Sequence, residues 1–238
     1  MNDRPGVTIR SELRQSLTRD DAVYAARGVF VALEGGEGVG KTTQARLLTD
    51  WLTSAGYDVV LTREPGDSSV GEKLREILLN PQTGDLDNRA EALLYAADKA
   101  EHVEKLVRPA LERGAVVITD RYVDSTLAYQ GAGRDQSAKE VEQVARWATA
   151  ELRPHLTVLL DLEPQVGLDR FAEADRLEAE PVTFHERVRQ SFLALAAADP
   201  DHYLVVDARD EQATIAETIR GRLTGLLSRV ERHHGAEA

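Results

Sequence analysis

The sequence predicts an α/β fold in which helices flank a parallel sheet of five strands. Two observations lead to it: five short runs are rich in Val, Ile and Leu, and the segments between them carry apolar residues every three or four positions. The runs do not alternate apolar with polar residues, which is typical of strands buried on both faces. Strands that alternate with helices form right-handed βαβ units, so a single doubly wound domain is expected.

Each expected element follows from one of these two patterns. The strand runs are VFVAL, DVVLT, AVVIT, LTVLL and YLVVD, each about five residues long, a usual strand length. These strands span 29–33, 58–62, 115–119, 156–160 and 203–207. The helical spacing of apolar residues covers 42–55, 69–79, 88–112, 137–150, 183–198 and 211–230.

The expected domain covers residues 28–232, where no Pro-, Gly- or Ser-rich linker interrupts the pattern. Residues 1–27 carry few apolar side chains and an early Pro-Gly pair, which predicts a loosely ordered extension. The alternative is a helix that caps the domain. Residues 233–238 are expected to form a short tail.

Composition excludes several classes of protein. The 238 residues include no cysteine, which rules out disulfide scaffolds, cysteine-ligated zinc, iron–sulfur clusters and thiol catalysis. The net charge of −12 argues against binding to nucleic acid. No apolar run approaches the roughly 18 residues of a membrane span, and the charged N-terminal segment lacks the apolar core of a signal peptide. No membrane association and a cytoplasmic location are therefore expected.

A phosphate-binding loop follows the first expected strand. Residues 35–42 read GGEGVGKT and match G-x-x-x-x-G-K-[ST]. The glycines let backbone N–H groups converge on phosphate oxygens, and the next helix adds its N-terminal dipole. Lys41 would place a positive charge between the β- and γ-phosphates, and the Thr42 hydroxyl would bind Mg²⁺. The residues expected to bind the nucleoside triphosphate are Gly35, Gly36, Glu37, Gly38, Val39, Gly40, Lys41, Thr42 and Thr43.

Three classes of P-loop protein compete for this site: GTPase switches, hydrolysing ATPases and kinases of small acceptors. The first usually carries Asn-Lys-x-Asp, but no asparagine precedes a lysine in this chain. An ATPase needs a group that activates water, commonly a Glu after the Walker B carboxylate. The strand AVVIT instead runs into Asp120 and Arg121. Asp120 can support Mg²⁺ through water, whereas Arg121 can clamp a second phosphate in the crevice at the strand ends.

A second strand-end arginine favours the kinase. Arg63 follows the strand DVVLT, so Arg63, Arg121 and Lys41 would form a local positive cluster in an acidic chain. Two phosphorylated ligands need that many cations, whereas one does not. Glu37 within the loop either faces solvent or pairs with a nearby arginine while accepting a hydrogen bond from a sugar hydroxyl of the acceptor.

Taken together, these motifs resemble the thymidylate kinase family over essentially all of residues 28–230. The segments that carry the resemblance are EGGEGVGKTTQ (34–44), TREPG (62–66), AEALLYAADKAEHV (90–103), PALERGAVVITDRYVDSTLAYQGAGR (109–134), PHLTVLLDLEPQVGLDR (154–170) and DRLE (175–178). The resemblance implies the P-loop nucleoside monophosphate kinase fold. It also implies ATP-dependent phosphorylation of dTMP to dTDP, with Mg²⁺ as cofactor, ATP and dTMP as partners, and a homodimer.

The resemblance assigns roles at the matching positions. Lys41 and Thr42 would bind ATP phosphates and Mg²⁺, and Asp120 would support the metal. Arg63 and Arg121 would grip the dTMP phosphate. The positions implied to contact or border the deoxyribose and base are Glu37, Tyr95, Lys99, Thr126 and Gln130.

Residues 170–180 match the lid that closes over ATP, which would exclude water from the reaction. Relatives without an arginine in the phosphate loop usually place a catalytic arginine in the lid. That residue would be Arg176 or Arg170, with Arg176 preferred here.

The chain departs from the family pattern at two positions. Asp67 replaces the usual second glycine after Arg-Glu-Pro-Gly, which predicts an altered turn. Lys99 replaces a thymine-contacting arginine, and lysine lacks the planar fork of a guanidinium. Lys99 therefore leaves open a kinase with another or broader set of nucleoside monophosphates. A catalytically silent nucleotide-binding regulatory protein is the alternative of another class. The intact Lys41, Thr42, Asp120 and Arg121 argue against it.

Overall fold

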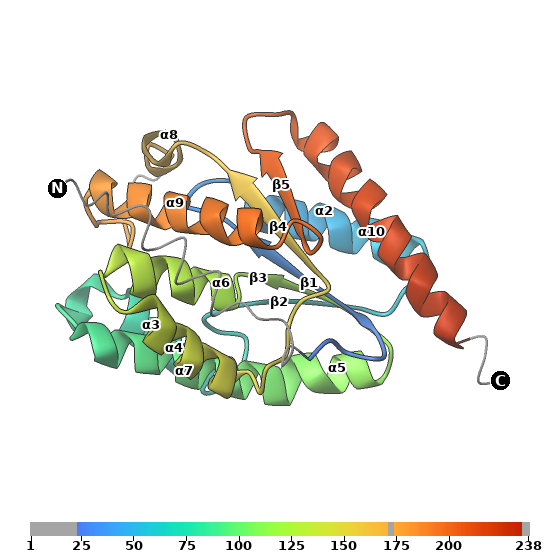
Figure 1. Cartoon of the computed structure of the whole chain (residues 1–238), viewed down its shortest axis with the longest axis horizontal. Coiled ribbons are helices and arrows are strands. Elements are labelled where there is room, and N and C mark those ends of the chain that lie inside the picture. The colour runs from blue at the N-terminus through green and yellow to red at the C-terminus, as the bar shows by residue number, and fades with distance from the viewer. Residues whose placement is uncertain (1–22, 171–173, 235–238) are drawn as a thin grey trace, which may run out of the picture.

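The computed structural model describes residues 23–170 and 174–234. A sheet of five parallel strands lies at the centre, in the order β2-β3-β1-β4-β5 (Figure 1). The strands are β1 (Val29–Glu34), β2 (Val59–Arg63), β3 (Val116–Asp120), β4 (Leu156–Asp161) and β5 (Tyr203–Asp207). β1 pairs with β3 on one side and with β4 on the other, so the phosphate loop leaves the middle of the sheet. The predicted parallel α/β fold and all five strands are confirmed.

Helices cover both faces of the sheet (Figure 1). They are α2 (Lys41–Ser54), α3 (Gly71–Leu79), α4 (Asn88–His102), α5 (Arg108–Glu112), α6 (Val123–Thr126), α7 (Ala138–Ala148), α8 (Pro164–Leu168), α9 (Val182–Ala198) and α10 (Gln212–His234). A π-helical turn, Val103–Val107, joins α4 to α5, so the helix expected over 88–112 is continuous but locally widened. A second π-helical turn, Leu127–Gly133, continues α6.

Alternate residues of β1 enter two separate apolar cores. Val29, Val31 and Leu33 pack with residues of α2 and α10. Phe30 and Ala32 face the other way and pack with residues of α5, α7 and α9. Both faces of β1 are therefore covered by apolar side chains, which fixes the end of the strand at which the phosphate loop begins.

The prediction that every strand is buried on both faces is wrong for the two edge strands. Leu61 on β2 is 40% exposed and Val205 on β5 is 49% exposed. Each of these strands has only one neighbouring strand, and the helices above and below cover the middle of the sheet first. An apolar run in a parallel sheet therefore indicates a strand without indicating whether it lies at the edge.

Residues 123–133 form helical turns that the sequence does not predict. The segment contains two glycines, which disfavour helix, and it is short. Packing overrides this preference: a Cβ on Gly133 would lie 2.6 Å from the ring of Phe184 on α9. The glycine thus permits the close approach of α9 to the segment that carries the predicted base-binding residues.

The ends of the chain are described in part. Residues 1–22 of the predicted extension and 235–238 of the predicted tail lie outside the described residues. Val23 pairs in parallel with Leu152 in an isolated bridge, and its backbone N–H donates to Glu151 O at 3.1 Å. Residues 23–27 are thus joined to the domain, and α10 runs two residues into the expected tail. None of the helices in the described ranges has the length and apolar character needed to cross a membrane.

Candidate active site

The phosphate loop connects β1 to α2, which begins at Lys41. Gly38 adopts a φ of +65°, and a Cβ there would lie 2.3 Å from Gly167 O, so only glycine fits this turn. The Lys41 ammonium lies over the loop and donates to Gly36 O at 2.6 Å and to Gly35 O at 3.2 Å. Burial, followed by the charge of Arg121, lowers the pKa of Lys41 to about 8. The lysine is thus protonated at neutral pH and tied to the loop.

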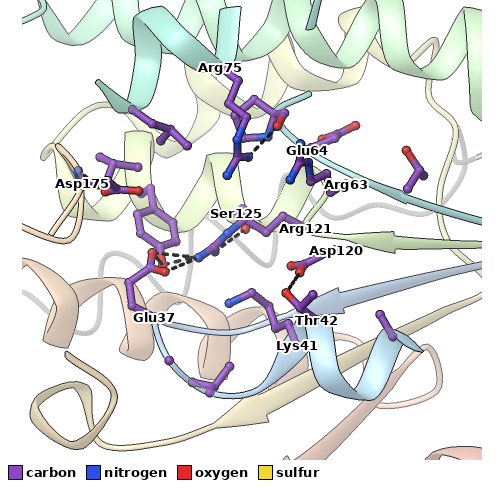
Figure 2. Close-up of a pocket in the computed structure, with 18 of the residues that line it drawn as sticks. Glu37, Lys41, Thr42, Arg63, Glu64, Arg75, Asp120, Arg121, Ser125 and Asp175 are labelled. Atoms are coloured by element: carbon purple, nitrogen blue, oxygen red, sulfur yellow. Dashed lines mark hydrogen bonds and ion pairs between the residues drawn. The ribbon is translucent and has the colours of Figure 1, made fainter. Parts of the chain in front are cut away.

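The Thr42 hydroxyl donates to Asp120 Oδ2 at 2.6 Å (Figure 2). Thr42 is in the first turn of α2, and Asp120 is the last residue of β3. The pair places a hydroxyl and a carboxylate oxygen together at the carboxyl edge of the sheet. These are hard oxygen donors of the kind that Mg²⁺ prefers. The residues therefore fit a magnesium ion.

Arg121 occupies the centre of the cleft (Figure 2). Its backbone takes a φ of +72°, and its N–H donates to Leu33 O at 2.9 Å. The guanidinium donates to both carboxylate oxygens of Glu37 at 2.8 Å, and Nη1 reaches Gly35 O at 3.2 Å. Although burial alone would raise it, the charge of Arg121 holds the pKa of Glu37 below its ordinary value. Glu37 therefore pairs with an arginine, and its contact with a sugar hydroxyl of the acceptor stays a prediction.

Glu34, at the end of β1, holds the turn that carries Arg121. It is fully buried, and its carboxylate accepts hydrogen bonds from Tyr122 N (2.8 Å), Ser125 N (3.2 Å) and Ser125 Oγ (2.6 Å). Burial raises the pKa of Glu34 to about 7. These bonds anchor the residues on the carboxyl side of Arg121 to the central strand. They compensate for the unfavourable left-handed backbone conformation of the arginine.

The turn after β2 keeps a compact form despite the missing second glycine. Asp67 adopts a φ of +59°, a left-handed conformation that Asp tolerates better than most residues. Its carboxylate accepts the Arg63 backbone N–H at 2.9 Å and lies 3.2 Å from Arg63 Nε. The Arg63 side chain, 47% exposed, also bonds Glu72 Oε1 at 3.1 Å. The aspartate therefore stabilises this turn through the Arg63 backbone, and the predicted alteration of the turn relative to the family stays a prediction.

One cleft of about 800 Å³ contains most of these groups. Its walls bring the phosphate loop together with Arg63, Arg121 and Arg170, and with four of the predicted residues for the deoxyribose and base. These are Tyr95, Lys99, Thr126 and Gln130. Thr126 and Gln130 are buried, and no partner for the Thr126 hydroxyl is found within the described part of the chain. A cleft of this volume is large enough for a small organic ligand.

Lys99 borders the cleft, but its ammonium forms an ion pair with Glu64. The side chain is 2% exposed. Glu64 also bonds His102 Nδ1 at 2.7 Å, and His102 Nε2 lies 2.8 Å from Thr62 Oγ1. Although burial alone would raise it, Lys99 and His102 hold the pKa of Glu64 below its ordinary value. A contact between Lys99 and the base stays a prediction, because the structure assigns the charge of Lys99 to Glu64.

Asp98 lies against the same cluster, and its carboxylate contributes a pH dependence to stability. It accepts the Gly66 backbone N–H at 3.0 Å, and burial followed by the charge of Glu64 raises its pKa to about 7. Between about pH 4 and pH 7 the folded protein then holds a proton that the unfolded chain has lost. The contribution of Asp98 to the free energy of unfolding therefore falls as pH rises through this range, by up to ~1.4 kcal/mol per pH unit.

Asp98→Asn is expected to reduce this slope by up to one proton's contribution. The asparagine Oδ1 can still accept from Gly66, so the turn is retained. Urea denaturation between pH 5 and pH 7.5 measures the slope for the wild type, for Asp98→Asn and for Asp58→Asn, an exposed control. An unchanged slope in Asp98→Asn would contradict the assignment of the proton to Asp98.

The two candidate lid arginines occupy different places. Arg170 Nη1 donates to Gly38 O of the phosphate loop at 2.5 Å. Arg176 instead pairs with Glu91 on α4, and its Nε donates to Leu78 O at 2.7 Å. Arg170 borders the cleft that holds the loop, whereas Arg176 is not among the residues that line it. Residues 171–173 of the predicted lid lie outside the described residues.

The comparisons with known proteins agree with this geometry. The sequence model of the thymidylate kinase family matches residues 33–219. The chain belongs to the thymidylate kinase family. The thymidylate kinase of Cutibacterium acnes is 58% identical over 202 residues, covering 85% of this chain and 99% of that protein. The thymidylate kinase of Clavibacter sepedonicus is 56% identical over 205 residues, covering 84% and 97%.

The fold of the family is shared as well. The crystal structure of thymidylate kinase from Ehrlichia chaffeensis superposes with a TM-score of 0.70 at 29% identity, covering 83% of this chain and 99% of that one. The predicted thymidylate kinase family and P-loop nucleoside monophosphate kinase fold are confirmed. This member of the family is an enzyme, a phosphotransferase, so the silent regulatory alternative is not supported.

Several residues of the thymidylate kinase cleft escape sequence reasoning. Ser125 and Tyr129 follow Arg121 at four-residue intervals, and both are within 3.3 Å of its guanidinium. This spacing fits one face of a helix, but the sequence of the segment does not predict a helix. Arg75 borders the cleft and donates to Pro65 O at 2.8 Å, and nothing in its sequence neighbourhood indicates this. Glu91, which contacts Gln130 from outside the lining of the cleft, was not predicted either.

Proposed function

We propose that the cleft holds ATP at the phosphate loop and dTMP beside Arg121, and passes the γ-phosphoryl group directly from one to the other. The reaction of the thymidylate kinase family is the ATP-dependent phosphorylation of dTMP to dTDP, and it is the reaction of this chain. One observation supports the assignment of the two sites best. Lys41 and Arg121 both bond the carbonyl oxygen of Gly35, each at 3.2 Å. The phosphates that these two cations would bind are therefore neighbours.

Transfer of a phosphoryl group depends on alignment and charge more than on covalent chemistry by the protein. Lys41 and the N-terminus of α2 would bind the ATP phosphates, and Arg121 would hold the attacking phosphate in line with them. Thr42 and Asp120 would hold Mg²⁺, which neutralises phosphate charge when bound. The test is the fate of the γ-phosphoryl group: label from ATP is expected in dTDP, and its release as inorganic phosphate would contradict direct transfer.

The acceptor would lie between the Arg121 and α4 sides of the cleft. Arg63 would add a second cation to its phosphate, and Glu37 would accept from the deoxyribose. Tyr95 is 7% exposed on the wall of the cleft, where its ring can stack on a base. The unpartnered hydroxyl of Thr126 and the amide of Gln130 would bond the base edge. These buried polar groups favour a ligand that satisfies them, because a ligand that cannot do so leaves them unpaired.

We assign the catalytic role in the lid to Arg170, because it reaches the phosphate loop. Arg170→Ala is expected to lower kcat about a hundredfold, the usual loss for one charge-stabilising donor, with little change in KM for dTMP. Arg176→Ala serves as the comparison, since its partners are Glu91 and the end of α3. Steady-state kinetics with dTMP measures both. A larger fall in kcat for Arg176→Ala would reverse the assignment.

A homodimer and a cytoplasmic location complete the proposal. Helices α3, α4 and α7 form a layer in which α4 packs against both of the others. Each presents a large apolar side chain to the outside: Ile77 (41% exposed), Leu93 (59%) and Trp147 (81%). Such exposure on a neighbouring set of helices is typical of a surface that a partner covers. This layer therefore supports the dimer that the resemblance implies. Dependence on ATP supports the cytoplasm.

A further inference from the structure

We propose that Glu91 is a positioning residue that fixes the orientation of the Gln130 side-chain amide, and thereby selects a base with an N–H donor where thymine carries N3–H. The inference rests on the proposed contact between Gln130 and the base. It deepens that assignment, because the Gln130 amide has both an acceptor oxygen and a donor NH₂ group, and the inference explains why only the oxygen would face the base.

The carboxylate of Glu91 is the centre of a buried network. Glu91 lies on α4 with 0% exposure. Its Oε1 accepts Gln130 Nε2 at 3.0 Å and Arg134 Nε at 3.1 Å. Its Oε2 accepts Arg134 Nη2 at 3.1 Å and bonds Arg176 Nη2. Arg134 and Arg176 thus donate to the two oxygens of the carboxylate, and a further hydrogen bond comes from the Gln130 amide.

An ionised carboxylate can only accept hydrogen bonds. Although burial alone would raise it, hydrogen bonds from Arg134, Gln130 and Arg176 hold the pKa of Glu91 below its ordinary value. The amide of Gln130 must therefore turn its NH₂ group to Glu91, because the opposite orientation would bring two acceptors together. The side-chain amide of Gln136 also donates from Nε2 to the backbone carbonyl oxygen of Gln130 at 3.0 Å, which fixes the residue further.

The consequence for the base follows from the two arms of an amide. When Nε2 is bound to Glu91, Oε1 is the acceptor on the other arm, and Gln130 borders the cleft. Thymine carries an N–H donor at N3, whereas cytosine carries a lone pair there. A fixed acceptor bonds the first and opposes the second. A site built around such a hydrogen bond rejects the mismatched ligand strongly, because its buried polar groups are left unpaired.

Glu91→Gln is expected to invert this preference. Oε2 accepts from both arginines, whereas Oε1 accepts from Arg134 Nε and Gln130, so the new amide is expected to turn its oxygen to the Oε2 position and its NH₂ group to Gln130, at the loss of the bond from Arg134 Nε. Gln130 must then turn its own oxygen to residue 91 and its NH₂ group to the cleft. The ratio of kcat/KM for dTMP to that for dCMP is expected to fall at least about tenfold, with an absolute rise for dCMP. Glu91→Asp keeps an acceptor-only group and is expected to keep the wild-type ratio.

Two further variants separate this inference from its alternatives. Glu180→Gln removes a carboxylate that also pairs with Arg134 but does not contact Gln130, so its ratio is expected to match the wild type. Gln130→Leu removes the contact to the base and is expected to lower the ratio, with no additional effect of Glu91→Gln in the double variant. If Gln130→Leu lowers the ratio and Glu91→Gln does not, the positioning role is wrong. If neither lowers it, the proposed contact between Gln130 and the base is wrong as well. A fall of the same size in Glu180→Gln would show that the effect of Glu91→Gln comes from the loss of a negative charge beside Arg134 and not from the orientation of Gln130. That result would overturn the proposal.

A measurement on the wild-type protein covers the case in which Glu91→Gln does not fold. The side-chain NH₂ group of Gln130, assigned in ¹⁵N-edited spectra by its absence from Gln130→Leu, is expected to be protected from solvent exchange in the protein without nucleotide. Rapid exchange of both protons would overturn the proposal. The substrate ratio itself is taken within one preparation, so a partly unfolded sample does not alter it.

Discussion

Lys41→Ala is expected to lower kcat for phosphoryl transfer by a factor of about 10² to 10³. The ammonium is the charge that the phosphate loop brings to the transferring group, and loss of one such preorganised donor commonly costs a factor of 10² to 10³ (roughly 3–4 kcal/mol). Its bonds to Gly35 O and Gly36 O show that the side chain already lies over the loop. The loss falls on kcat because charge builds up on the transferring group in the transition state.

Single-turnover transfer from ATP to dTMP measures this step without the influence of product release. Lys73→Ala is the matched control, since Lys73 is an exposed lysine on α3 outside the lining of the cleft. The control is expected to retain wild-type rates. Transfer by Lys41→Ala within a few-fold of the wild type would exclude the assigned role of the lysine.

Arg121→Ala is expected to reduce kcat/KM for dTMP by a factor of about 10³ or more while ATP binding is largely spared. A guanidinium that stabilises the transferring phosphates can contribute factors of this size to kcat. The side chain contacts Gly35 of the phosphate loop and Glu37, so its removal affects the boundary between donor and acceptor. Affinity for ATP by calorimetry, measured beside the kinetics, separates the two effects.

The substitution also leaves the Glu37 carboxylate buried without its cation, which can cost a few kcal/mol of stability. The double variant Arg121→Ala/Glu37→Gln removes that charge. It is expected to regain stability toward urea without regaining transfer. If the double variant transferred phosphate at the wild-type rate, the loss in Arg121→Ala would reflect misfolding, and the acceptor clamp would lie elsewhere.

Much of the fold was predictable because each strand of a parallel sheet appears in the sequence as a short apolar run. Five apolar runs correspond to β1–β5 within one residue at most ends, and β1 satisfies the prediction on both faces. The exposure of Leu61 and Val205 was not predictable, because strand order is set by packing and not by the strand's own residues. The helical turns over 127–133 depend in the same way on the approach of Phe184.

The residues of the candidate site can also be divided into those that the sequence predicts and those that depend on packing. Lys41, Thr42, Asp120 and Arg121 were predictable because each lies at the carboxyl end of a strand or in the segment that follows it, and parallel strands end at one edge of a sheet. Glu34 and Glu91 were not, although both are buried carboxylates with several hydrogen bonds. Their partners lie about 40 to 90 residues away in sequence, so only the folded chain brings them together. The resemblance to the family supplied the base-binding positions, which local sequence alone did not indicate.

The cleft is expected to phosphorylate dTMP at the expense of ATP. The most direct test is ADP release with ATP and Mg²⁺, measured in parallel with dTMP, dUMP, dCMP, dGMP and AMP and without acceptor. Release with dTMP far above every other reaction is the predicted result, and it would also show that an ion-paired Lys99 is compatible with selection of thymine. Comparable release with several acceptors, or release that does not require an acceptor, would contradict the account.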